Sequence, residues 1–147
     1  GFQVWVNLPA RDKMVPPRYQ DIPASRIPEA TSADGRVKVR VIAGESLGQS
    51  AVIETHTPIL YLHFTLLRAG DERIVVSEGQ MALFGSGGAV RLAVEDKTGE
   101  PAELLLLAGR PLNEPVERYG PFVMNTRQEI IQAIRDYNEG RLGKIDF

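Results

Sequence analysis

The most informative absence in this chain of 147 residues is cysteine, which does not occur at all. Without thiolates the chain can form neither a disulfide framework nor a cysteine–zinc site, and it has no cysteine nucleophile. Only two histidines are present, His56 and His63, so the chain cannot supply three histidine ligands to a metal by itself. A domain of this length buries roughly 68–70% of its unfolded surface. A hydrophobic core can therefore stabilise it without disulfides.

Long apolar runs and a large charge of one sign are also missing. The longest strongly apolar stretch is residues 104–108, far below the roughly 20 residues that a membrane span needs. Lysine and arginine total 17, aspartate and glutamate total 19, and the net charge is −2. Because no basic stripe or block of like charges is present, direct nucleic-acid binding is not expected.

The N-terminal residues show no targeting signal. They lack the basic start and the small-residue cleavage site of a signal peptide. The chain begins without methionine, inside an expected strand. We therefore expect a piece of a larger protein that is cytoplasmic and does not associate with membranes.

Alternation of apolar and polar residues predicts several short β-strands. The strands are expected over residues 2–8, 36–43, 59–66, 73–76, 80–84, 89–94 and 103–108. The residues expected to face the core are Val37, Val39 and Val41, and then Leu60, Leu62, Phe64 and Leu66. The strand over residues 103–108 has no polar face, so we expect it to be central and buried on both sides. Short strands at this spacing indicate an antiparallel sandwich or barrel.

Residues 9–30 are expected to form an irregular linker laid over the surface, because proline lacks an amide donor and biases its predecessor to extended geometry. The prolines are Pro9, Pro16, Pro17, Pro23 and Pro28. Side chains expected to anchor the linker are Met14, Tyr19, Ile22 and Ile27.

One helix is predicted, near the C-terminus and packed outside the barrel. Thr126 and Glu129 have the spacing of a capping box. Ile130, Ile134 and Tyr137 follow at helical spacing, and Gly140 is placed to end the helix.

Residue chemistry alone predicts no catalytic, cofactor-binding or metal-binding residue. A facial metal triad needs two histidines and a carboxylate, and both histidines are more simply interpreted as structural or surface residues. His63 lies on the face opposite the apolar one, where it points to solvent or to a partner layer. Residues 78–80 indicate a tight turn, and residues 85–88 indicate a hairpin loop because they lack the phosphate-binding lysine pattern. Trp5 and Tyr19 are predicted to be packing anchors.

Three segments together closely resemble the pirin family. They are Gly1 to Pro9 (GFQVWVNLP), Lys13-Met14 with Pro16 to Gln20, and Arg118 to Thr126 (RYGPFVMNT); Ala108 to Leu112 with Glu114-Pro115 adds to them. The resemblance extends to about Gly143. Pirins are bicupins, so it implies a mainly β fold, a cupin-type antiparallel β-barrel or jelly roll with one C-terminal α-helix. Residues 1–30 would be the last strand of a preceding cupin plus the linker, 31–125 the C-terminal cupin, and 126–147 the helix and tail.

The family holds a non-haem iron in its N-terminal cupin, through three histidines and a glutamate that lie upstream of Gly1. The resemblance therefore implies that this chain is not catalytic by itself, contains no cofactor, and has the N-terminal cupin as its partner. The parent would be an iron-dependent oxidoreductase like quercetin 2,3-dioxygenase, acting on a small aromatic substrate. The alternative is an iron-dependent transcriptional cofactor or protein-interaction module with a regulatory protein as partner. For the isolated chain, a β fragment with no independent activity is expected.

The chain departs from the family pattern after Leu66. Pirins continue there through a proline-containing loop and another core strand, whereas here Leu66 runs almost directly into the segment before Val76. A hairpin is expected to be missing near residues 66–67. Such a deletion would leave an open barrel with an unpaired edge, which favours strand pairing with another chain.

Overall fold

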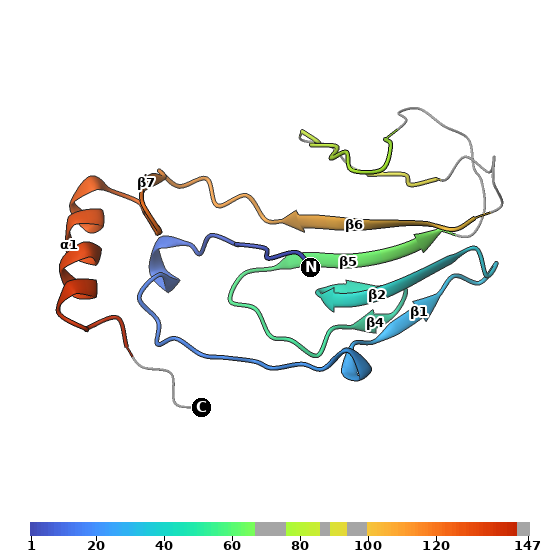
Figure 1. The fold of residues 1–147 in the computed structure, drawn as a ribbon, viewed down its shortest axis with the longest axis horizontal. Coiled ribbons are helices and arrows are strands. Elements are labelled where there is room, and N and C mark those ends of the chain that lie inside the picture. The colour runs from blue at the N-terminus through green and yellow to red at the C-terminus, as the bar shows by residue number, and fades with distance from the viewer. Residues whose placement is uncertain (67–75, 86–88, 94–99, 144–147) are drawn as a thin grey trace.

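The computed structural model describes residues 1–66, 76–85, 89–93 and 100–143, and its main element is a four-stranded antiparallel sheet (Figure 1). The strands follow the order β1-β2-β5-β6. They are β1 (Glu29–Thr31), β2 (Val37–Ala43), β5 (Ile59–Leu66) and β6 (Ala102–Gly109). The fold is therefore mainly β and antiparallel, as predicted. The described strands do not close into a barrel.

The core lies on one face of this sheet. Val39, Val41 and Leu62 are almost fully buried. Side chains that pack against them while partly buried are Ala30, Ala51, Leu60, Phe64 and Leu106. Pairing of Val39 with Phe64, and of Val41 with Leu62, places the predicted apolar faces of β2 and β5 side by side. The prediction from period-two alternation is confirmed for both strands.

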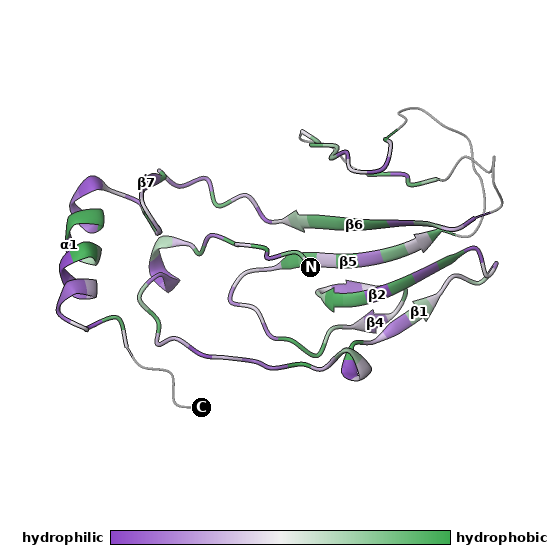
Figure 2. Ribbon diagram, in the orientation of Figure 1, coloured by the Kyte–Doolittle hydropathy of each residue, from purple (hydrophilic) through white to green (hydrophobic). Residues whose placement is uncertain are grey.

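The position of β6 differs from the prediction. β6 pairs with β5 along one side, and none of its residues is buried. Leu107 is 52% exposed, although Figure 2 shows much of the strand as hydrophobic. The expectation that this strand is central and buried on both sides is wrong for the described sheet. Its other side has no strand partner among the described residues, because residues 76–85 and 89–93 form no strands.

Several other expected strands are corrected or lie outside the described residues. Residues 2–8 and 80–84 and the described residues 89–93 form no strand. Alternation of apolar and polar residues favours a strand, but a strand forms only when its backbone can hydrogen-bond to a neighbouring strand. No described strand pairs with these residues. Most of the strand expected over residues 73–76 lies outside the described residues, as does most of the loop expected over residues 85–88. The turn at Glu78-Gly79 is present, closed by the Gln80 N–H donating to the Ser77 carbonyl at 3.0 Å.

The linker is irregular, as predicted, apart from two short 3-10 turns, Ala10–Asp12 and Ala24–Arg26. Ile22 and Ile27 are half-buried. Met14 is 62% exposed and Tyr19 is 72% exposed, so both leave most of their surface in water. Trp5, the other predicted packing anchor, is 75% exposed.

Two hairpins were not predicted. One joins β3 (Glu45–Ser46) to β4 (Gln49–Ser50), between two of the expected strands. The other joins β7 (Glu117–Tyr119) to β8 (Phe122–Met124). These strands are too short for alternation to reveal them.

The helix α1 (Arg127–Asn138) follows β8 and forms as predicted. Thr126 and Glu129 make the reciprocal capping box. At the other end, Gly140 adopts φ +69°, and the N–H of Arg141 donates to the Asp136 carbonyl at 2.7 Å. This is a Schellman ending, which requires a left-handed residue at the glycine position. None of the helices among the described residues is long and apolar enough to cross a bilayer.

Candidate functional site

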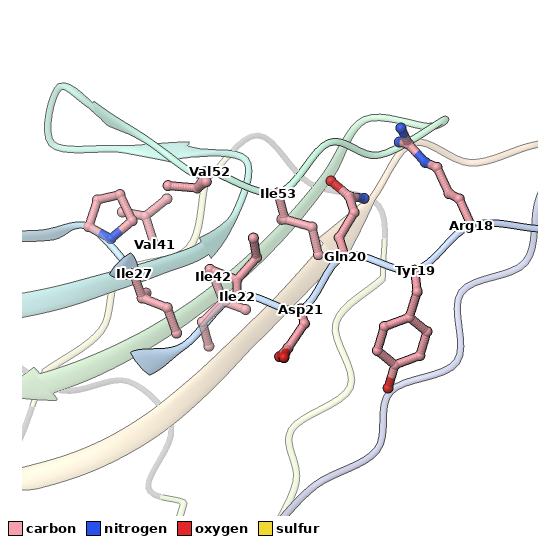
Figure 3. Close-up of a pocket in the computed structure, with 11 residues that line it drawn as sticks. Arg18, Tyr19, Gln20, Asp21, Ile22, Ile27, Val41, Ile42, Val52 and Ile53 are labelled. Atoms are coloured by element: carbon pink, nitrogen blue, oxygen red, sulfur yellow. The ribbon is translucent and has the colours of Figure 1, made fainter. Parts of the chain in front are cut away.

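A pocket of 470 Å³ lies between the linker and β2 (Figure 3). Its apolar lining is Ile22, Ile27, Pro28, Val41, Ile42, Val52 and Ile53, and its other lining residues are Arg18, Tyr19, Gln20 and Asp21. Ile22 and Ile27 of the linker line one side of the pocket. Residues of β2 and the two residues Val52 and Ile53 complete its apolar lining. An apolar floor with a few polar groups is typical of small-molecule sites.

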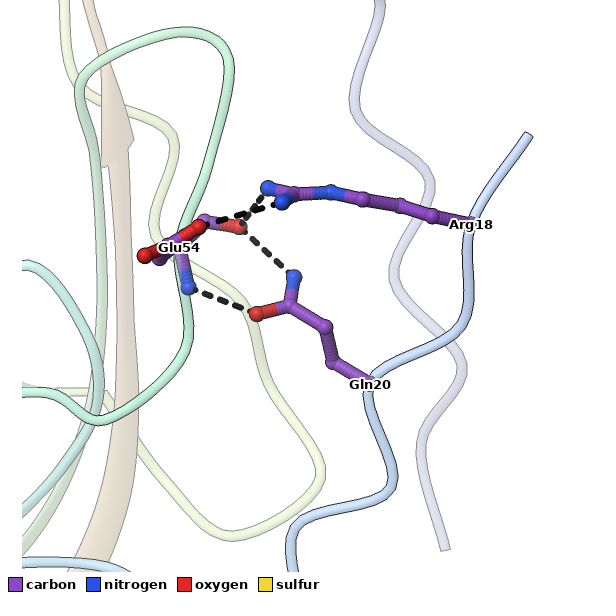
Figure 4. A network of polar contacts seen from close by, with 3 residues as sticks. All are labelled: Arg18, Gln20 and Glu54. Atoms are coloured by element: carbon purple, nitrogen blue, oxygen red, sulfur yellow. Dashed lines mark hydrogen bonds and ion pairs between the residues drawn. The ribbon is translucent and has the colours of Figure 1, made fainter. Parts of the chain in front are cut away.

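The polar side of this pocket is held by a clamp between the linker and the loop before β5 (Figure 4). The Gln20 side-chain amide donates to the Glu54 carbonyl at 2.8 Å, and the Glu54 N–H donates to Gln20 Oε1 at 3.0 Å. Arg18 donates to the same carbonyl through Nη2 and to the Glu54 carboxylate through Nη1, both at 3.1 Å. The clamp fixes the linker against the loop and leaves the guanidinium and carboxylate already paired with each other.

A second pocket of 490 Å³ lies where the β3–β4 hairpin meets the ends of β5 and β6. Glu45 and Arg110 are among its lining residues. Gly44 is required beside it, because the residue has φ +85° and a Cβ there would stand 2.5 Å from the Ile59 carbonyl oxygen. The close contact of the hairpin with β5 therefore depends on glycine at this position.

Neither histidine belongs to a metal-binding group in the described part of the chain. His56 is exposed. His63 lies on the sheet face opposite the core, 25% exposed, with Nε2 3.4 Å from Glu103 Oε2. Arg40 lies beside His63 on the neighbouring strand β2. Its hydrogen bond to Glu29 of β1, together with its charge, lowers the pKa of Glu29 below its usual range. Residues 1–66, 76–85, 89–93 and 100–143 contain no group of three or more histidine, cysteine, aspartate or glutamate side chains that could hold a metal. These residues do not fit the iron site that the family resemblance implies.

The N-terminal segment, which precedes the linker, exposes large aromatic side chains. Phe2 is 82% exposed and Trp5 is 75% exposed. The base of the segment is nevertheless fixed: Lys13 Nζ donates to Asn7 Oδ1 at 2.6 Å and to the Val123 carbonyl at 3.2 Å. The segment is thus held against β8 while its aromatic side chains project into solvent.

Comparison with solved structures defines the class of fold. The chain is similar to the crystal structure of quercetin 2,3-dioxygenase from Acinetobacter baumannii, with a TM-score of 0.68 and 32% sequence identity. The match covers 95% of this chain and 56% of that one. The family model of the Pirin C-terminal cupin domain matches residues 36–143. The fold is therefore that of a cupin, and the chain belongs to the pirin family, as the motifs predict.

The curated relatives are longer than the part of them that this chain matches. A pirin-like protein of Solanum lycopersicum is 40% identical over 168 aligned positions, which cover 97% of this chain and 56% of the relative. Human Pirin is 39% identical, with 57% of its length covered. A Pseudomonas aeruginosa protein named as a candidate quercetin 2,3-dioxygenase is 37% identical, with 59% covered. The chain thus spans little more than half the length of these relatives.

Sequence reasoning did not find the clamp or the two pockets. Gln20 and Glu54 carry no pattern that links them, because their contact joins a side chain to a backbone 34 positions away. The only available signal was the proline-rich character of the linker, which predicted a segment laid over a surface.

Proposed function

We propose that this chain is the non-catalytic C-terminal half of a two-cupin protein, and that it packs against an N-terminal cupin that carries iron. The whole protein would be an oxidoreductase like quercetin 2,3-dioxygenase, acting on a small aromatic substrate. The names of the Acinetobacter and Pseudomonas proteins support this choice of activity. The role of this chain is to complete the domain interface and to form one wall of the cleft between the domains.

The exposed N-terminal segment is the observation that carries the proposal. Phe2 and Trp5 leave most of their surface in water, and burying apolar surface is favourable by roughly 25 cal/mol per Å². The Asn7–Lys13 contact holds the base of the segment in place, so a partner surface would meet it already ordered. A second domain that covers these aromatic side chains accounts for both their exposure and their anchoring.

Iron chemistry is assigned to the partner domain because the described residues of this chain do not fit a metal. This chain contributes packing and position instead. The Gln20–Glu54 clamp fixes the linker that leads from the N-terminal segment to β1. The segment and the sheet are therefore held in one relative position, which a domain interface needs.

The test compares the 147-residue chain with the longest protein that its gene encodes. We expect the longer protein to contain iron by metal analysis and to consume quercetin, and the 147-residue chain to do neither. Quercetin turnover by the 147-residue chain alone would overturn the non-catalytic assignment. A longer protein that binds no iron would overturn the assignment of the iron site.

The proposed interface between the two domains is tested separately by introducing Trp5→Ala into the 147-residue chain and into the longer protein. We expect this variant to lower the melting temperature of the longer protein and to leave the 147-residue chain unchanged, because Trp5 is already solvated there. Tyr119→Ala is the matched control, since Tyr119 is 68% exposed and lies on β7 instead. Equal effects of Trp5→Ala on both forms would contradict the proposed interface.

A protein-interaction module is the second candidate. Ile131 is 45% exposed and Tyr137 is 65% exposed on α1, a surface that a regulatory protein could cover. Iron binding by the longer protein without any quercetin turnover would favour this candidate over the dioxygenase.

A further inference from the structure

We propose that the outer edge of β6, which has no strand partner among the described residues, binds the same edge of a second copy of this chain, forming an antiparallel dimer. The two β6 strands would join the two four-stranded sheets into one continuous sheet across a two-fold axis. The occupant is another copy of this chain because the outward backbone groups of two β6 strands can bond each other without bringing like charges together.

The register identifies which backbone groups are free. The Arg110 N–H donates to the Pro58 carbonyl at 3.3 Å, and the pairing continues without a shift from Ile59–Gly109 to Leu66–Ala102. In an antiparallel pair, hydrogen-bonded and non-hydrogen-bonded positions alternate. The residues whose N–H and C=O point away from β5 are therefore Glu103, Leu105, Leu107 and Gly109. These groups form a regular row that another strand can bond.

The opposite edge of the sheet is much less suited to pairing. β1 has three residues, and the Val41 N–H donates to the Pro28 carbonyl. The same alternation leaves only Glu29 and Thr31 pointing outward. Glu29 is charged and bonded to Arg40. Short, charged edges are the usual protection against strand addition, and β6 has eight residues with one charge.

A two-fold axis at Leu106 gives a pairing without charge repulsion. It places Leu105 of one copy opposite Leu107 of the other, and Glu103 opposite Gly109. The outward groups of both strands then face each other as hydrogen-bonded pairs. The two glutamates stay at opposite ends of the interface. Because the same patch serves both copies, the assembly closes at a dimer.

The alignment with the tomato relative also supports an outer edge of β6 that no internal strand covers. The alignment with the tomato relative extends over 168 positions, more than the 147 residues of this chain. The relative therefore carries residues inside the aligned region that have no counterpart here. This agrees with a missing hairpin near residues 66–67, and a second copy of β6 would supply a strand in place of an internal one.

The test measures the mass of the 147-residue chain by sedimentation velocity over a range of concentrations. We expect a reversible dimer of twice 16.2 kDa. Leu107→Lys, which sets two positive charges into the interface, is expected to weaken the dimer by about tenfold, or about 1.4 kcal/mol. Leu47→Lys is the matched control and should leave the dimer intact, because Leu47 is also 52% exposed but lies in the β3–β4 turn.

Amide hydrogen exchange of the unmodified chain provides a second readout that needs no variant. We expect the Leu105 and Leu107 amides to become protected as concentration rises. Those of Leu104 and Leu106, which bond β5, should be protected throughout. A monomer at every concentration, assemblies that grow beyond a dimer, or a dimer whose Leu105 and Leu107 amides stay unprotected would each overturn the proposal.

Discussion

The side-chain amide of Gln20 satisfies both backbone polar groups of Glu54, donating to its carbonyl and accepting from its N–H. This is the bonding that a neighbouring β-strand would provide, supplied here by one side chain. The loop before β5 therefore gains a strand-like partner from the linker without either segment adopting strand geometry.

Gln20→Ala is expected to lower the free energy of unfolding by about 1 kcal/mol, because two hydrogen bonds are lost near the surface. Urea unfolding followed by circular dichroism measures the change. Gln128→Ala is the control, since the side chain of Gln128 is exposed on α1 and makes no hydrogen bond to the described residues. If both variants unfold at the same urea concentration as the unmodified chain, the clamp does not contribute to stability.

Leu62→Ala is expected to cost about 2–5 kcal/mol, because Leu62 is 3% exposed and packs in the core between β2 and β6. Leu83→Ala removes the same atoms from a side chain that is 90% exposed, and should change stability by less than about 0.5 kcal/mol. Urea unfolding of the two variants side by side measures the difference. Similar losses would show that the assigned core is wrong.

Gly44→Ala should destabilise the chain more than Gly48→Ala. Both glycines have positive φ, +85° and +74°, so each variant carries backbone strain of about 1–2 kcal/mol. Only at Gly44 would the new Cβ also collide with β5, whereas nothing lies within 4 Å at Gly48. Thermal unfolding separates the two contributions. Equal melting temperatures would mean that the β3–β4 hairpin does not contact β5 as described.

Stability should depend on pH through Asp136. Hydrogen bonds from Arg141, at 2.8 Å, and from Gln132 lower the pKa of Asp136 below its ordinary value of 3.8. The ionised carboxylate therefore stabilises the folded chain above that value, and the stabilisation is lost as the pH falls through the lowered pKa. Asp136→Asn should reduce the melting temperature at neutral pH, and the difference from the unmodified chain should shrink in acid.

The control for this prediction is Asp21→Asn, because the Asp21 carboxylate has no hydrogen-bond or ion-pair partner among the described residues. It should change the melting temperature little at either pH. A difference between Asp136→Asn and the unmodified chain that stays constant down to the lowest pH would contradict the assigned role of the carboxylate.

Elements governed by local pattern were predictable from the sequence. β2 and β5 alternate clearly, and α1 has its cap and terminal glycine in the predicted places. Of the predicted apolar stripe Ile130 is buried, but Tyr137 is 65% exposed. β6 was located correctly but was assigned the wrong environment. An all-leucine strand indicates burial on both faces only if other strands cover it, and that depends on residues far away in the sequence. Residues 2–8 failed for the same reason, because propensity does not provide a partner.

The candidate site was much less predictable than the fold. The pocket beside β2 is formed by linker residues that belong to no regular element, so their register against the sheet follows no period. Tyr19, which was predicted to anchor the linker, is 72% exposed, whereas Gln20, its neighbour, makes the hydrogen bonds to Glu54. A polar side chain that bonds a distant backbone leaves no pattern in composition or spacing.

The contacts of Lys13 and Ala10 connect the beginning of the chain to its end. Lys13 bonds Val123, and the Ala10 N–H donates to Glu114 at 2.8 Å, across separations of 110 and 104 positions. A ribosome must therefore synthesise nearly the whole chain before its first segment can be fixed. Until then the segment that carries Phe2 and Trp5 is not fixed to β8, and contacts of such long sequence separation are slow to form. The order of synthesis, as well as the final packing, thus determines when this surface becomes available to a partner.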